Sequence, residues 1–97
     1  MIIIPDPLSF DWDSGNIHKN LKKHKVSCQE AKEVFNNQPL LINQDQKHSL
    51  SEIRLQALGV SNNNRHLFLS LTIRNKKIRI MSVRDVNLKE KKIYEKA

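Results

Sequence analysis

The 97-residue chain has little of several residue types, and each scarcity argues against a class of protein. Two glycines are too few for a glycine-rich loop that cradles a nucleotide phosphate. The single cysteine, Cys28, allows no internal disulfide, so a reducing compartment such as the cytoplasm is expected. Aromatic residues make up 5% of the chain, too few for a platform on which single-stranded bases stack. The four histidines are scattered without metal-ligand spacing, so no metal site and no cofactor are expected.

Long hydrophobic runs are also missing. The apolar stretch Met1 to Ile4 stops at Pro5 and follows no basic residue, which argues against a signal peptide. No run approaches the roughly 20 apolar residues that a membrane span needs. The length and the hydrophobic content of 38% predict a single small domain over residues 1–97.

Positive charge is plentiful, and it is concentrated. The formal net charge is +7, and residues 54–84 contain basic side chains but no acidic one. These basic residues are Arg54, Arg65, Arg74, Lys76, Lys77, Arg79 and Arg84. Lys and Arg that neutralise phosphates release counterions, so this stretch predicts a surface that binds nucleic acid. The alternative is that the charge only keeps a small domain soluble.

Hydrophobic periodicity predicts an α+β domain, with a mostly antiparallel sheet of four to five strands and helices packed on one side. Capping boxes at Ser27–Glu30 and Asn87–Glu90 mark the starts of a second helix and of a short C-terminal helix. The other expected elements are strands over 8–12, 39–43, 53–59, 67–73 and 77–83, and a first helix over 15–25.

The strongest strand signal lies in residues 67–73, where apolar residues alternate. A two-residue loop at Asn75 and Lys76 would form a hairpin with the next strand. In that register Thr72 faces Arg79, with Arg74 diagonal to it. Two guanidinium groups on one face repel each other, so we expect an anion between them. If each guanidinium group instead paired with a carboxylate of the same chain, this charge argument would be lost, and any function would have to be inferred from similarity to a known family.

This face carries Arg54, Thr72, Arg74 and Arg79, and we expect it beside a helix that carries Lys23 and His24. Such a set suits metal-independent RNA cleavage, in which cations stabilise a phosphorane and a base activates the ribose 2′-OH. Arginine binds phosphate through two parallel hydrogen bonds, and histidine can act as base or acid. Plainer readings stay open: His24 as a helix-end residue, Thr72 as a strand former, and Glu90 as a capping residue.

An ordered set of short matches runs from about Phe10 to Tyr94. The set comprises Trp12-Asp13, Asn20, Lys23-His24-x-Val26-Ser27, Glu30-Ala31, Val34-Phe35, Glu52-x-Arg54, Gly59, Thr72-x-Arg74, Ile78-Arg79-Ile80-x-Ser82-x-Arg84, and Glu90 with Tyr94. In this order and at this spacing, the chain resembles the BrnT toxins of bacterial type II toxin–antitoxin systems.

The resemblance implies a RelE-like ribonuclease fold and a cytoplasmic endoribonuclease toxin that inhibits translation. It also implies a BrnA-like antitoxin with a ribbon-helix-helix DNA-binding part, which masks the basic face of the toxin. The catalytic candidates are then Thr72, Arg74, Arg79, Arg84 and His24, and the substrate-binding candidates are Lys19, Lys23 and Arg54.

Several positions depart from the family pattern, among them Asn16, Lys25, Ser51 and the stretch Ser82–Val86. Asn16 stands where the family usually has Lys, which removes a phosphate contact or a catalytic group, and Lys25 stands where it usually has Gly. The alternative reading is therefore a non-catalytic module that binds nucleic acid or the antitoxin.

Overall fold

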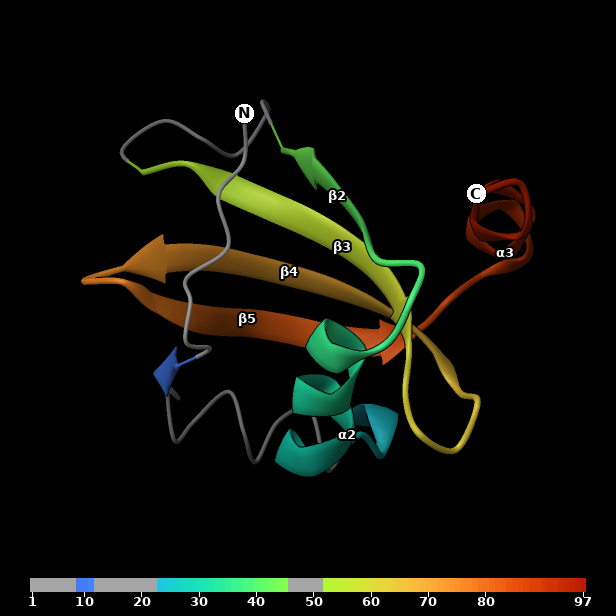
Figure 1. The fold of residues 1–97 in the computed structure, drawn as a ribbon, viewed down its shortest axis with the longest axis horizontal. Helices are drawn as coiled ribbons and strands as arrows, with labels where there is room; N and C mark the ends of the chain where they lie inside the picture. The colour runs from blue at the N-terminus through green and yellow to red at the C-terminus, as the bar shows by residue number, and fades with distance from the viewer. Residues whose placement is uncertain (1–8, 12–22, 46–51) are drawn as a thin grey trace.

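A computed structural model describes residues 9–11, 23–45 and 52–97, in which five strands form one sheet of order β1-β5-β4-β3-β2 (Figure 1). The strands are β1 (Phe10–Asp11), β2 (Leu41–Gln44), β3 (Arg54–Val60), β4 (His66–Arg74) and β5 (Lys77–Asp85). The helices are α2 (Cys28–Glu33), a 3₁₀ turn η1 (Val34–Asn36) that continues it, and α3 (Leu88–Glu95). In the described part of the chain, no helix is long and apolar enough to cross a membrane.

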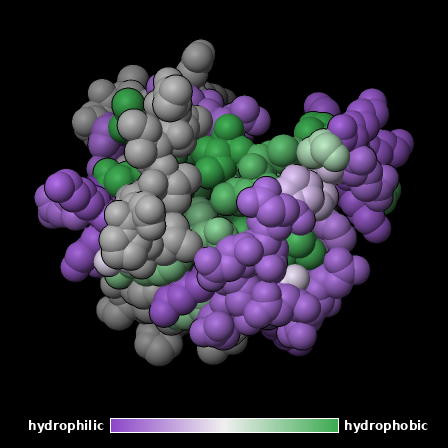
Figure 2. All heavy atoms as spheres, viewed as in Figure 1, coloured by the Kyte–Doolittle hydropathy of each residue, from purple (hydrophilic) through white to green (hydrophobic). Residues whose placement is uncertain are grey.

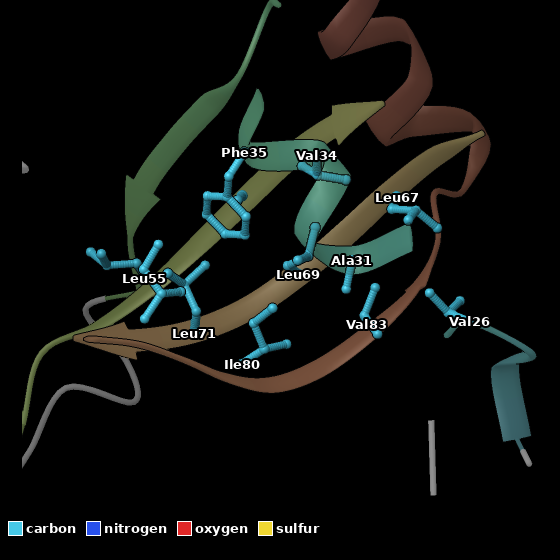
Figure 3. Packing of buried hydrophobic residues seen from close by; sticks show 12 residues of the cluster. Val26, Ala31, Val34, Phe35, Leu55, Leu67, Leu69, Leu71, Ile80 and Val83 are labelled. Atoms are coloured by element: carbon cyan, nitrogen blue, oxygen red, sulfur yellow. The ribbon is translucent and has the colours of Figure 1, made fainter. Parts of the chain in front are cut away.

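The core lies between α2 with η1 and one face of the sheet, here called the inner face (Figure 3). Apolar residues alternate along the strands, so those of one parity all point toward the helix. The fully buried ones include Leu67, Leu69, Leu71, Ile78 and Ile80. Gly59 is required where β3 passes η1, because a Cβ there would collide with Cγ1 of Val34. The surface of α2 seen in Figure 2 is largely hydrophilic, as expected for a helix that buries one side only, whereas α3 exposes Leu88 and Ile93.

The predicted hairpin between β4 and β5 is confirmed. Asn75 and Lys76 have φ of 51° and 62°, the left-handed conformation that a two-residue hairpin turn with matching twist requires. Thr72 pairs with Arg79, as the two-residue loop predicts. The register shifts farther along, because Leu71 pairs with Ile80 whereas Ser70 pairs with Ser82. One residue of β5, Met81, is therefore extra, and the strand has a β-bulge at this point.

Both predicted helix starts carry a cap. At α2, the Ser27 side chain accepts a hydrogen bond from the Glu30 backbone. At α3, Asn87 and Glu90 form the complete reciprocal capping box. The Tyr94 hydroxyl donates to the Pro39 carbonyl at 2.6 Å, which fastens α3 to the segment before β2.

Two expectations about the architecture need correction. The sheet is mixed, because β1 runs parallel to β5. Alternation of apolar residues shows which side of a strand is buried but not its direction, so the sequence pattern could not distinguish the two. The described residues contain two α-helices rather than three. Most of the first expected helix, over 15–25, lies outside the described residues, although Lys23 and His24 at its end are helical.

Candidate functional site

The face of the sheet turned away from α2, here called the outer face, carries a row of polar residues across four strands. Arg54 of β3 pairs with Thr72 of β4, Thr72 pairs with Arg79 of β5, and Arg79 pairs with Asp11 of β1. Their strand neighbours Leu55, Leu71, Ile78 and Ile80 belong to the buried core. Because side chains alternate between the faces, the row is brought together on the outer face as the register predicts.

Thr72 occupies the middle of this row and is 1% exposed. Its hydroxyl donates a hydrogen bond to the Ile53 carbonyl at 2.9 Å, just before β3 begins. The hydroxyl therefore ties β4 to the start of β3, and this bond would have to open before Thr72 could act on a substrate. Thr72 lies between Arg54 of β3 and Arg79 of β5, so β4 separates the two strands that carry these arginines.

Carboxylates contact the arginines of the outer face, contrary to the expectation that an external anion must lie between them. Arg79 Nη1 lies 3.3 Å from Asp11 Oδ2. Arg74 donates two hydrogen bonds, of 2.8 and 2.7 Å, to the carboxylate of Glu52. Both acids lie outside the acid-free stretch, so the fold brings negative charge to it from elsewhere in the chain. The argument from unneutralised charge therefore fails, and the expected function rests on the resemblance to the BrnT toxins.

Glu52 lies within the field of several arginines of the outer face. The hydrogen bonds from Arg74 lower the pKa of the Glu52 carboxyl, desolvation opposes them, and the positive charges of Arg74, Arg54 and Arg79 lower the pKa further. Glu52 in turn raises the pKa of Arg74. A carboxylate with a lowered pKa is a poor general base at neutral pH, so Glu52 is better suited to holding charge than to moving protons.

Arg84 has a different environment, near α3. Its guanidinium group donates to both oxygens of Glu90 at 2.8 and 2.9 Å and lies 4.3 Å from the centre of the Phe68 ring. The hydrogen bonds from Arg84 lower the pKa of Glu90. Glu90 also caps α3 through the Asn87 backbone, as the capping-box reading of this residue predicted. Arg84 therefore joins α3 to the outer face.

His24 and Lys23 lie away from the row. Arg65 donates to the carbonyls of His24 and Lys25, which places the end of the first helix beside β4 and β5. Arg65 also binds Asp85, at the end of β5, and Asp85 is six residues beyond Arg79, or roughly 20 Å along a strand. The structure therefore brings together Arg54, Thr72, Arg74 and Arg79, but not His24. Lys19 lies outside the described residues.

No pattern in the sequence indicates the role of Arg65. Besides the two carbonyls, it forms ion pairs with Glu30 at 3.1 Å and with Asp85 at 2.6 Å. The two carboxylates are 35 and 20 residues away in the chain, so no local spacing signals the contact. Lys25, whose carbonyl Arg65 binds, has φ of 55°, the strained helix end that a glycine would adopt at lower cost.

Comparison with known families gives a match over most of the chain. A model of the family described as "Ribonuclease toxin, BrnT, of type II toxin-antitoxin system" matches residues 12–90. The matched span contains Arg54, Arg74, Arg79 and Arg84 together with the strands that carry them. A comparison with curated proteins finds no match. Since the family match covers most of the 97 residues, the chain belongs to the BrnT family of ribonuclease toxins of type II toxin–antitoxin systems.

Proposed function

We propose that this toxin is a metal-independent endoribonuclease with a RelE-like fold, that it inhibits translation by cutting RNA, and that the outer face of its sheet binds the RNA. Membership of the BrnT family carries the proposal, and the placement of Arg54 and Arg79 on either side of Thr72 on one face of the sheet supports it. Guanidinium groups suit phosphate because they donate two parallel hydrogen bonds.

In the proposed reaction, the ribose 2′-OH loses its proton to a base and attacks the adjacent phosphorus. The bond to the 5′-oxygen then breaks, and that oxygen takes up a proton from an acid. The products are a 2′,3′-cyclic phosphate and a 5′-hydroxyl end. Because the nucleophile belongs to the RNA itself, the step consumes no water and needs no metal-bound hydroxide. Arg79, with Arg54 and Arg74 on the same face, stabilises the negative charge that develops on the phosphorane oxygens, and Arg84, farther along β5, contacts a neighbouring part of the RNA. Lys23 and His24, which lie away from the row, are assigned to other parts of the RNA strand, and Lys19 remains a predicted RNA-binding residue.

An antitoxin partner follows from membership of a type II system. We propose that it is a BrnA-like protein with a ribbon-helix-helix DNA-binding part, and that it covers the basic outer face. The toxin would then act in the cytoplasm, where translated RNA is found, and the complex would repress its own promoter. A short neighbouring reading frame for a ribbon-helix-helix protein is the observation that identifies this partner.

One structural observation favours a second candidate function. Arg74, Arg79 and Arg84 each contact a carboxylate of the chain itself. A face neutralised in this way could serve a non-catalytic module that binds RNA or an acidic antitoxin segment. Incubating the purified protein with RNA in EDTA separates the two functions. Cleavage supports the ribonuclease, whereas binding without cleavage supports the module.

Expression of Arg79→Ala tests the site itself. We expect this variant to relieve growth arrest and to lose RNA cleavage by on the order of 100-fold or more, because a donor to the phosphorane is removed. Its thermal unfolding should match that of the parent, which shows that the fold is intact. Lys96→Ala, near the C-terminus and in an exposed position, serves as the charge-matched control. If Arg79→Ala and Arg74→Ala both arrest growth as strongly as the parent, the site is wrongly assigned.

A further inference from the structure

Two carboxylates of the chain contact the outer-face arginines here called the arginine cluster (Arg54, Arg74 and Arg79): Asp11 pairs with Arg79, and Glu52 pairs with Arg74. Glu52 precedes β3 and accepts two hydrogen bonds from Arg74, with the shorter at 2.7 Å. Arg54 follows Glu52 by two residues in the chain, and Thr72 aligns it with Arg79 across the sheet. The positive charges of all three arginines lower the pKa of Glu52. The carboxylate therefore occupies a position where three cations favour an anion.

The contact between Glu52 and Arg74 is suited to exchange with solvent or ligand. The Arg74 side chain is 47% exposed and that of Glu52 is 28% exposed, so water screens the pair. The hydrogen bonds to the Glu52 carboxylate come from Arg74. Glu90 offers a contrast, because it binds Arg84 and also caps α3, so releasing it would free a helix end. Glu52 precedes a strand and caps no helix in the described part of the chain, so its release from Arg74 frees no helix end.

A phosphodiester presents the same pattern to arginine that a carboxylate does, namely two oxygens that accept parallel hydrogen bonds. The guanidinium edge of Arg74 that donates through Nε and Nη2 is taken by Glu52. RNA phosphate and Glu52 must therefore compete for that edge.

We propose that Glu52 is a resident anion that RNA displaces: a backbone phosphate takes the place of its carboxylate on Arg74 when RNA binds the arginine cluster. This inference rests on the proposed function, because it places RNA on the outer face. The resident carboxylate makes the cluster selective. A single small anion gains little by exchanging one negative charge for another, whereas a strand that contacts several cations at once displaces Glu52 and gains the remaining contacts.

The test is the affinity of Glu52→Gln for a fluorescent single-stranded 2′-O-methyl RNA, which lacks the nucleophile and is not cleaved. In the parent the phosphate must first break the exposed ion pair of Glu52 with Arg74, and Glu52→Gln removes that cost without changing the number of phosphate contacts. We expect RNA binding to tighten by up to about fivefold, the worth of one exposed ion pair, with the salt dependence of log K close to that of the parent, measured by fluorescence anisotropy across a salt series. Glu95→Gln, an exposed carboxylate of α3, makes the same change in net charge and should leave both quantities close to those of the parent.

Glu52→Gln combined with Arg74→Ala distinguishes displacement from a general charge effect. If a phosphate takes the place of Glu52 on Arg74, the gain disappears when Arg74 is absent. A gain that persists in the Arg74→Ala background overturns the proposal, as does a gain equal to that of Glu95→Gln. Weaker binding by Glu52→Gln also overturns it, because Glu52 would then orient Arg74 for RNA rather than compete with it.

Failure of the proposed RNA surface gives a different result. Arg54→Ala and Arg79→Ala would then bind the 2′-O-methyl RNA as well as the parent does. If those two variants lose affinity while Glu52→Gln shows no tightening, the RNA surface stands and only the displacement is wrong.

Discussion

The two faces of the sheet are built from the same strands but differ in what holds their side chains. On the inner face, Leu67, Leu69 and Leu71 are 0% exposed and pack against one another and against α2. On the outer face, arginines meet carboxylates that are distant in sequence, and the pair of Arg74 with Glu52 is open to water. Burial of apolar area stabilises a fold in proportion to the area, whereas exposed ion pairs contribute little. The inner face therefore carries the stability of the domain, and the outer face can change partners without unfolding it.

Adjacent residues of β4 give the sharpest test of this contrast. Leu69 points to the inner face and is fully buried, while Ser70 points to the outer face. We expect Leu69→Ala to lower the free energy of unfolding by about 2–5 kcal/mol, because it removes buried methyl groups and leaves a cavity. Ser70→Ala should change it by no more than about 0.5 kcal/mol. Urea unfolding followed by circular dichroism measures both. Similar losses for the two variants would remove the distinction between the faces.

Two arginines give the next largest contrast. Arg65 is 27% exposed and binds Glu30, Asp85 and the carbonyls of His24 and Lys25. We expect Arg65→Ala to destabilise the fold by about 1–3 kcal/mol, since it breaks several charge-assisted hydrogen bonds at once.

The matched variant on the outer face is Arg74→Ala, which should unfold at the same urea concentration as the parent. Growth arrest should respond in the opposite order: Arg74→Ala should reduce it more than Arg65→Ala does, although Arg74→Ala leaves the stability of the fold unchanged. An Arg74→Ala variant as unstable as Arg65→Ala would show that the outer face is structural too.

The smallest expected effect concerns pH. Arg84 holds the pKa of Glu90 below its ordinary value of 4.5, so ionised Glu90 stabilises the folded state above that pH. This contribution is lost as the pH falls through the lowered pKa. Glu90→Gln should therefore be less stable than the parent by about 1 kcal/mol at neutral pH, and the difference should shrink on acidification to about pH 3. Urea titrations across this range measure it. A difference that stays constant with pH would mean that the charge of Glu90 contributes nothing.

Local patterns predicted the parts of the fold that local physics determines. Alternation in residues 67–73 located β4, and Asn75 with Lys76 predicted the hairpin that pairs Thr72 with Arg79. The direction of β1 was beyond such reasoning, because it depends on which edge of the sheet is available to a two-residue strand.

The candidate site shows the same division. Placing Arg54, Arg74 and Arg79 on one face required only the period of a strand and a turn. Their carboxylate partners were not predictable, because Asp11 and Glu52 reach them from 68 and 22 residues away. His24 was grouped with the arginines on charge and chemistry, and the contacts of Arg65 place it at the far end of β5.

The bulge in β5 has a consequence for how chains of this kind can vary in length. Because Met81 is the extra residue, Ile80 and Val83 both point inward, and Arg79 and Arg84 both point outward although one number is odd and the other even. Losing one residue at this position would restore strict alternation and leave every later side chain on its present side. Losing one from a regular part of β4 or β5 would turn the remainder of the strand over and bury its charges. A single-residue deletion is thus tolerated at the bulge of β5 but not in the regular part of the strand.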